Sequence, residues 1–141
     1  MAIRTADAEW RGNLAHGKGR IRLGAGAYLG SYDFRSRMED GQGTSPEELL
    51  GAAHAGCFSM ALALQLSRAG AIVERIYTNA KVHFDQRDGG WSIHRIDLET
   101  EASVSNVSAA AFEEEAQKAK QTCPVSRALS GVDIHLQAKL L

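Results

Sequence analysis

Two cysteines are the residues of this sequence best suited to redox chemistry. Cys57 lies within a long apolar segment, and Cys123 lies directly before Pro124. A thiolate can attack the O–O bond of a peroxide and become a sulfenic acid, and a second thiol can condense with that sulfenic acid to a disulfide. A lone cysteine in an apolar helix is usually a small core residue. It is therefore the pair of thiols, one central and one at a helix break, that indicates a peroxidatic and a resolving cysteine.

Activation of such a thiol needs a positive charge. An ordinary cysteine has a pKa of about 8.5 and is mostly protonated at neutral pH. Arg37 is our candidate cation, because it lies just before the loop that leads into the segment carrying Cys57. A guanidinium can stabilise the thiolate and donate hydrogen bonds to the peroxide oxygens. Glu47 could orient that arginine. The competing interpretations are an arginine that faces solvent from a strand and a glutamate that only complements a helix dipole.

The spacing of Glu47 and Cys57 constrains any site that they share. Ten residues of continuous helix separate them by about 15 Å and place them on different faces. If both serve one site, Glu47 must come from another subunit or the helix must be broken. The same helix carries a row of small residues at spacing four, which favours close packing against a second helix: Gly51, Ala55, Ser59 and Ala63. Together these observations favour an intertwined dimer with sites at its interface.

Other polar residues give weaker signals. His54 lies three residues before Cys57 on nearly the same helical face and could act as a base or a metal ligand. No third ligand accompanies it at a conventional spacing, so we expect no metal site. Ser59 and Ser126 lack the Gly-x-Ser-x-Gly setting of a serine hydrolase. We interpret the remaining histidines as structural: His16, His83, His94 and His135.

Local signals predict a helix over residues 46 to 68 or 69. Ser45 can cap it, Pro46 suits its first position, and Glu48 completes a capping box. Gly70 supplies the stop. Because this helix is apolar nearly all round, we expect other elements to bury it.

Short β segments are expected on both sides of that helix. Glycine-punctuated stretches predict strands at residues 20–23 and 27–32. An alternating pattern around an Asp-Gly-Gly turn at residues 88–90 predicts a long hairpin. Its apolar residues change parity on the return strand, so we expect a bulge or twist near His94 or Arg95.

The last third of the chain predicts a helix and a strand. The helix is expected over residues 108–121, with Pro124 interrupting it and starting a short turn through Leu129. A final strand is expected at residues 132–138, where apolar and polar residues alternate. With no repeat or linker in the sequence, we expect a single domain over residues 1–141.

Composition narrows the classes of partner. The chain is 44 % hydrophobic and 23 % charged with a net charge of −1, which favours a soluble globular protein and gives no electrostatic footprint for nucleic acid or an anionic membrane. No apolar signal begins the sequence, so a cytoplasmic location is the default expectation. Residues 49–67 are long enough to cross a bilayer. Their Ala, Gly, His, Ser and Gln content argues against insertion.

Two motifs resemble those of the OsmC/Ohr family of thiol peroxidases. They are GTSPEELLGAAHAGCFSMAL at residues 43–62 and AKQTCPVS at residues 119–126. The sequence is more similar to the OsmC branch, osmotically inducible protein C, than to the organic hydroperoxide resistance branch. The resemblance covers nearly the whole chain.

The resemblance implies a fold, an activity and a set of site residues. The fold is α+β, an intertwined homodimer whose central buried helices are wrapped by curved antiparallel sheets. The activity is reduction of organic hydroperoxides, in which Cys57 matches the peroxidatic cysteine and Cys123 the resolving one. Glu47 matches the carboxylate that holds the catalytic arginine. Arg37 matches that arginine, with Arg35, on the same face of a strand, as the competitor.

Substrate and reductant follow from the same comparison. The site would be apolar, which favours bulky organic peroxides, and four residues could offer it surface or could belong to the core: Leu49, Leu50, Phe58 and Met60. No cofactor is needed, since sulfur carries the redox change. Electrons must come from an external thiol or dihydrolipoyl dithiol.

Two other functions compete with the peroxidase. One is a non-enzymatic stress or ligand-binding protein on the same dimeric fold. The other is a redox sensor or thiol–disulfide exchanger in which the two cysteines pair without peroxide specificity. The conjunction of two cysteines, Glu47 and an upstream arginine is better explained by peroxide reduction.

Overall fold

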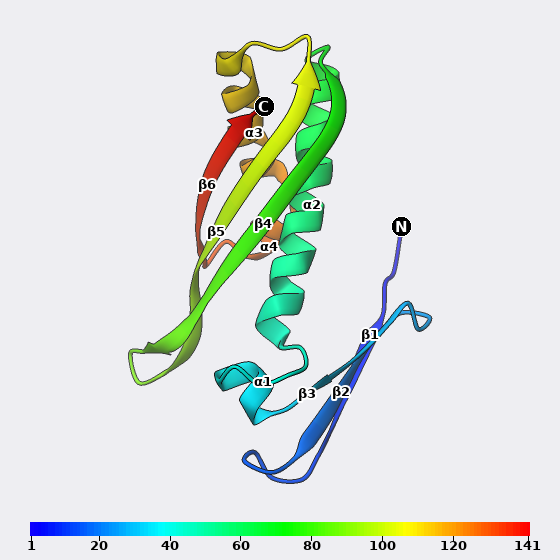
Figure 1. Ribbon diagram of the computed structural model, residues 1–141, viewed down its shortest axis with the longest axis vertical. Coiled ribbons are helices and arrows are strands. Elements are labelled where there is room, and N and C mark those ends of the chain that lie inside the picture. Colours follow the sequence, from blue (N-terminus) through cyan, green and yellow to red (C-terminus); the bar gives the residue numbers. More distant parts are fainter. The chain divides into compact units, whose positions relative to one another are not determined.

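A computed structural model describes all residues from 1 to 141 (Figure 1). The chain forms two compact units, Met1–Leu49 and Leu50–Leu141. The elements, in chain order, are β1 (Ala6–Arg11), β2 (Lys18–Leu23), β3 (Tyr28–Tyr32), α1 (Phe34–Met38), α2 (Pro46–Arg68), β4 (Ile72–Arg87), β5 (Gly90–Ser105), α3 (Ala109–Thr122), α4 (Pro124–Ala128) and β6 (Asp133–Leu140). The predicted α+β class is confirmed.

The first unit is built on an antiparallel sheet in the order β1-β2-β3. The two strands predicted before the long helix are present as β2 and β3, whereas β1 was not predicted. Gly19 in β2 lies under the rings of Trp10 and Tyr32, whose centroids are 5.5 Å apart. A Cβ at Gly19 would clash with both rings, so glycine is required for this aromatic contact.

The segment that carries Arg35 and Arg37 is a helix, and the prediction of a strand was wrong. α1 begins after Asp33, whose Oδ1 accepts from the Ser36 backbone N–H at 2.8 Å. The Asp33 backbone N–H donates in return to Ser36 Oγ at 2.8 Å. This reciprocal capping box stabilises a single turn that the apolar pattern alone does not reveal.

The long helix α2 has the predicted bounds. Its Ser45 Oγ accepts from the Glu48 backbone N–H at 3.1 Å, as the capping signal requires. The Glu48 carboxylate accepts from the Thr44 hydroxyl at 3.4 Å and not from the Ser45 backbone N–H, so the second bond of the predicted capping box is not formed. At the other end, Gly70 adopts a φ of 85°, the left-handed conformation in which a helix commonly stops.

The row of small residues on α2 faces a strand, so the prediction of a second helix there was wrong. A Cβ on Gly51 would lie 3.2 Å from a Val82 methyl of β4. The Ser59 hydroxyl forms a 2.8 Å hydrogen bond with the hydroxyl of Thr78, also on β4. Small side chains at these positions therefore let the helix lie close to the hairpin.

The second unit contains a sheet in the order β4-β5-β6. Asp88 and Gly89, both with positive φ, form the predicted turn between β4 and β5. His83 pairs with Arg95 while Phe84 pairs with Ile93, which leaves His94 as the extra residue of the predicted bulge. β6 joins the other edge of β5 in parallel, so antiparallel pairing describes all strand pairs except this one.

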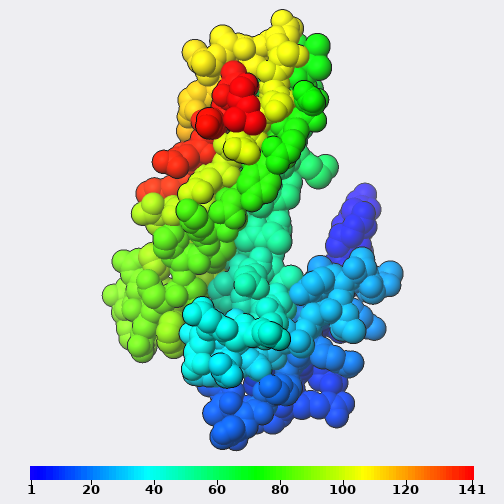
Figure 2. Space-filling view, viewed as in Figure 1, coloured from blue at the N-terminus to red at the C-terminus, as the bar shows by residue number.

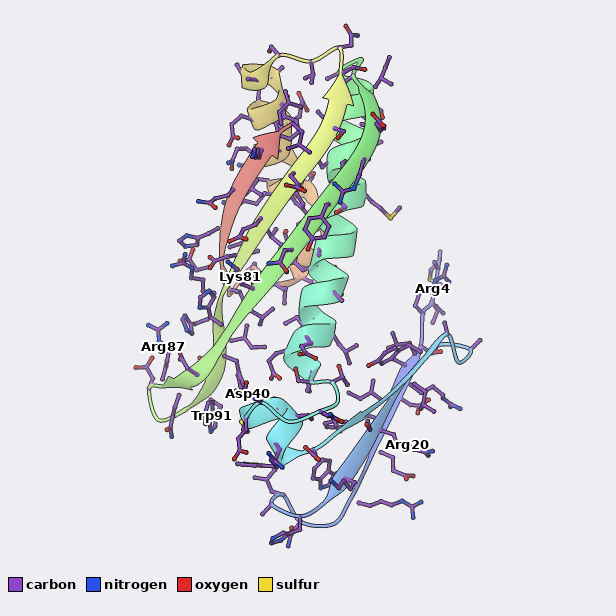
Figure 3. All side chains as sticks on the ribbon, viewed as in Figure 1. Arg4, Arg20, Asp40, Lys81, Arg87 and Trp91 are labelled. Carbon is purple, nitrogen blue, oxygen red and sulfur yellow. The ribbon has the colours of Figure 1, made fainter.

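The hairpin of β4 and β5, green to yellow in Figure 2, forms part of the surface seen there. Lys81 donates to Glu99 of the neighbouring strand at 2.7 Å. Arg87 and Trp91 lie at the tip of the hairpin (Figure 3). Trp91 packs there against Phe84, with ring centroids 5.1 Å apart.

Within this chain α2 is buried along one face only, so the expected burial by other elements is met on that face. The buried face is a row at spacing four, with His54, Phe58, Leu62 and Leu66 all fully buried. On another face, Met60 is 77 % exposed and Leu64 is 49 % exposed. By length and composition α2 could cross a membrane, a test that core helices of soluble proteins also pass.

Phe58 is central to the core cluster that α2 shares with β5 and α3. Phe58→Ala should lower the free energy of unfolding by about 3–5 kcal/mol, because it removes a buried ring and leaves a cavity. Phe58→Leu should lower it by clearly less. The measurement is urea unfolding at one fixed protein concentration, since association would add to the apparent stability. Equal and small losses in both variants would contradict this assignment of the core.

Candidate functional site

Cys57 and Cys123 meet in the second unit. Cys57 lies on α2 and is partly buried, whereas Cys123 lies between α3 and α4 and is fully buried. Both are free thiols, and their side chains are hydrogen bonded to each other. The structure thus brings together two sulfur atoms that are sixty-six positions apart in the sequence. Two thiols that interact directly are the arrangement that disulfide formation requires.

The local environment does not by itself favour the thiolate. Burial raises the pKa of the Cys57 thiol above its ordinary value, and the hydrogen bond with Cys123 raises it further. The Val125 backbone N–H lowers it, because this group donates a hydrogen bond to the Cys57 sulfur. No cation of the Leu50–Leu141 unit contributes. A reactive Cys57 therefore needs a positive charge from elsewhere.

The position of Cys123 follows from the proline after it. Pro124 cannot donate a backbone hydrogen bond and disfavours a helical conformation in the residue before it. Cys123 accordingly has a ψ of 123° and serves as the last cap of α3 and the first cap of α4. Its backbone N–H donates to Ala119 at 2.9 Å, and its carbonyl accepts from Arg127 at 3.0 Å. The helix break predicted from the sequence therefore holds the thiol at a defined place.

Arg37 and Glu47 form an ion pair in the first unit. Arg37 donates from Nε and Nη2 to Glu47 Oε1, at 3.1 and 2.8 Å. The Glu47 side chain is only 8 % exposed, and that of Arg37 is 38 % exposed. Two donors on one carboxylate fix the plane of the guanidinium. The Glu47 carboxylate also lies in the first turn of α2, where it complements the positive end of the helix dipole. Glu47 therefore both complements the dipole and binds Arg37.

Arg35 is directed to a different partner. Its Nε donates to Glu39 at 3.3 Å, four residues further along, and its side chain is 74 % exposed. Because α1 is a helix, residues two positions apart do not share a face. The structure therefore places Arg37, and not Arg35, against Glu47.

An apolar pocket lies beside Arg37. Its volume is about 240 Å³, and its lining residues all belong to the first unit: Trp10, Leu14, Tyr32, Asp33, Phe34, Arg37 and Met38. Apart from Arg37, none of these lining residues was predicted from the sequence, which offered Leu49, Leu50, Phe58 and Met60 as either pocket or core residues. Phe58 is fully buried in the core and cannot offer surface to a ligand. Trp10 and Tyr32 come close to Arg37 because β1, β2 and β3 pair, and this pairing cannot be predicted from neighbouring residues in the sequence.

His54 is a buried residue with a defined partner. Its Nε2 lies 2.8 Å from the Ser126 hydroxyl, and its Nδ1 has no hydrogen-bond partner. Burial lowers the pKa of His54 below its ordinary value, so the ring is neutral at physiological pH. No group of three or more His, Cys, Asp and Glu side chains is arranged to hold a metal ion.

Comparison with known proteins identifies relatives that match most of the chain. Peroxiredoxin OsmC of Escherichia coli is 45 % identical over 123 residues, which is 86 % of each chain. The uncharacterized protein YmaD of Bacillus subtilis is 28 % identical over 139 residues, which is 94 % of this chain and 91 % of the relative.

Solved structures share the fold. The organic hydroperoxide resistance protein OhrB of Bacillus subtilis has a TM-score of 0.71 and 27 % identity, covering 96 % of this chain and 98 % of its own. An organic hydroperoxide resistance protein from Elizabethkingia anophelis has a TM-score of 0.77 and 23 % identity, covering 99 % of both chains. A family model described as OsmC-like protein matches residues 39–137, which include both cysteines and Glu47. The resemblance inferred from the two sequence motifs is therefore confirmed, and the chain belongs to the OsmC-like protein family.

Proposed function

We propose that this protein is a thiol peroxidase that reduces organic hydroperoxides to alcohols. The observation that carries the proposal is the hydrogen-bonded pair of free thiols, Cys57 and Cys123. A relative at 45 % identity is named a peroxiredoxin, and a structural neighbour at 27 % identity is named an organic hydroperoxide resistance protein. Both names support this class of reaction.

The reaction has two steps, oxidation of Cys57 and formation of the disulfide. The Cys57 thiolate forms a bond to the outer peroxide oxygen while the O–O bond breaks, which gives a Cys57 sulfenic acid and an alkoxide that takes a proton to become the alcohol. The Cys123 thiol then attacks the sulfenic sulfur, which forms the disulfide and releases water. An external thiol or dihydrolipoyl dithiol supplies two electrons and two protons to restore the reduced pair. No cofactor takes part.

The arginine and the thiols of one site come from two copies of the chain in this proposal. α2 is an unbroken helix from Pro46 to Arg68. It therefore carries Glu47 and Cys57 about 15 Å apart along its axis. Of the two options left by the sequence, a broken helix or a second subunit, the unbroken helix supports the second. The exposed Met60 and Leu64 of α2 supply apolar surface for a homodimer.

In this dimer each Arg37 serves the partner's Cys57. Its guanidinium lowers the pKa of that thiol, against the effect of burial, and stabilises the charge that develops on the leaving oxygen. Glu47 keeps the guanidinium in position through the two hydrogen bonds from Arg37. Both units of the chain, Met1–Leu49 and Leu50–Leu141, then act as one functional domain over residues 1–141.

Preference for organic peroxides is supported by the pocket beside Arg37. Its aromatic and aliphatic lining suits an alkyl or aryl group, and the guanidinium at the same place suits the peroxide oxygens. Hydrogen peroxide has no apolar group that could pack against this lining, so the pocket gives it no added affinity. We place the reaction in the cytoplasm, where cysteines are kept reduced, as part of the response to oxidative or osmotic stress.

The first prediction tests the reaction itself. Reduced protein should consume cumene hydroperoxide much faster than hydrogen peroxide in a stopped-flow assay, and Cys57→Ser should abolish this consumption. Cys123→Ser should still react once and accumulate a sulfenic acid that a trapping reagent detects, because its resolving thiol is missing.

Two outcomes would assign the chain to another function. Consumption no faster than that of a free thiol would favour a non-enzymatic stress protein. Equal oxidation by an alkyl hydroperoxide and by a generic disulfide, with formation of the same Cys57–Cys123 disulfide, would favour a redox sensor or exchanger.

The second prediction tests the arginine against a matched control. Arg37→Ala should lower kcat/KM for cumene hydroperoxide by about 10²–10³-fold, because a donor to the developing negative charge is lost. Arg35→Ala removes the same charge two residues away and should leave the rate within about twofold.

The pH profile of the same variants gives a second measurement. The rate rises with pH as Cys57 loses its proton, and Arg37→Ala should move this rise to higher pH by at least about one pKa unit, since the cation that favours the thiolate is gone. Thiolate absorbance at 240 nm should move in the same direction. Unchanged profiles in Arg37→Ala, or equal losses in both variants, would refute the role of Arg37.

A further inference from the structure

His54 and Ser126 connect α2, which carries Cys57, to α4, which begins directly after Cys123. His54 lies on α2 three residues before Cys57, and Ser126 lies on α4 three residues after Cys123. Their hydrogen bond of 2.8 Å joins two buried side chains. It therefore joins α2 to α4, the helix that begins directly after Cys123.

The proton of this hydrogen bond is on His54 Nε2. A neutral imidazole carries one proton, either on Nδ1 or on Nε2. If Nδ1 carried it, a buried N–H donor would have no acceptor, since Nδ1 has no partner. Buried donors without partners are rarer than buried acceptors without partners. Nε2–H therefore donates to the Ser126 hydroxyl oxygen.

α4 depends on such a contact for its position. It has only five residues, too few to be a stable helix in isolation. It begins at the Pro124 break, and its first turn presents the Val125 backbone N–H that donates to Cys57. The Ser126 hydroxyl is the side-chain group of α4 that forms a hydrogen bond with α2. A shift of α4 would move Cys123 and the Val125 N–H together.

We propose that His54 and Ser126 are positioning residues, whose hydrogen bond holds Cys123 within reach of the Cys57 sulfur for disulfide formation. This proposal rests on the proposed peroxidase function, but it concerns the resolving step alone. After the first oxidation, the Cys57 sulfenic acid can condense with Cys123 and release water, or it can react with hydrogen peroxide to give a sulfinic acid and water. Loss of the hydrogen bond slows the condensation and so favours the sulfinic acid.

The experiment measures this partition. Reduced protein is exposed to increasing hydrogen peroxide, and intact mass separates the disulfide from the sulfinic acid. The readout is the peroxide concentration at which half of the oxidised protein is sulfinic. Ser126→Ala should lower it about fivefold, the factor that corresponds to a hydrogen bond worth about 1 kcal/mol. Ser126→Thr keeps the hydroxyl and should restore the wild-type value.

A matched control separates positioning from general destabilisation. Ser59→Ala removes another hydrogen bond between α2 and a neighbouring element, the one to Thr78 on β4. That bond does not reach the turn that carries Cys123. The partition of Ser59→Ala should therefore equal that of the wild type.

A second pair of variants keeps the test decisive if Ser126→Ala does not fold. The amide nitrogen of Gln can occupy the place of Nε2, whereas that of Asn is too short and corresponds to Nδ1. His54→Gln should therefore retain the wild-type partition, and His54→Asn should lower the half-point about fivefold. Both replacements are neutral amides, so their difference reports the hydrogen bond.

The outcomes distinguish this proposal from the peroxidase assignment. Excess hydrogen peroxide oxidises accessible thiols without a specialised site, so the partition can be measured even if cumene hydroperoxide is not a substrate. An unchanged half-point in both Ser126→Ala and His54→Asn, or an equal shift in Ser59→Ala, would overturn the positioning role. Slow cumene hydroperoxide reduction with the expected shift would overturn the function and leave the positioning role intact.

Discussion

The rise of an α-helix, about 1.5 Å per residue, sets the geometry on which the proposed site depends. α2 carries Glu47 in its first turn and Cys57 ten residues later, and it continues without interruption to Arg68. The carboxylate that orients Arg37 and the thiol that Arg37 would activate are therefore kept apart along one rigid element. This separation is the physical reason for assigning the two halves of a site to two copies of the chain.

The electrostatics of Cys57 agree with such a divided site. Burial and the neighbouring thiol of Cys123 raise the pKa of Cys57, and the single N–H donated by Val125 acts against them. Meanwhile Arg37 is bound to a nearly buried carboxylate, which fixes its orientation while 38 % of its side chain remains exposed. In the proposed dimer, a thiol whose own surroundings raise its pKa would meet the guanidinium that Glu47 holds in the partner chain. Assembly would then create reactivity that neither unit has by itself.

The buried polar residues of the second unit have an ordering role that apolar contacts could not fill. Apolar packing brings α2, α3 and the sheet together, but it tolerates small shifts of one element over another. A hydrogen bond has a narrow range of distance and angle. The bond between His54 and Ser126 therefore specifies where α4 lies on α2, and Cys123 and Val125 follow because the chain connects them to Ser126. The same reasoning applies to Ser59 and Thr78 at the contact of α2 with β4.

Features that depend on neighbouring residues could be predicted from the sequence. The cap at Ser45, the stop at Gly70, the break at Pro124 and the bulge at His94 were all predictable, because each arises from local hydrogen bonding, backbone conformation or apolar parity. The two cysteine motifs were sufficient to recognise the family. Three features could be found only in the folded chain: the small residues of α2 face a strand, Arg37 rather than Arg35 binds Glu47, and an apolar pocket lies beside Arg37. These features depend on contacts between residues far apart in the chain. Which of several possible contacts is most stable cannot be judged before the positions of the helices and strands are known.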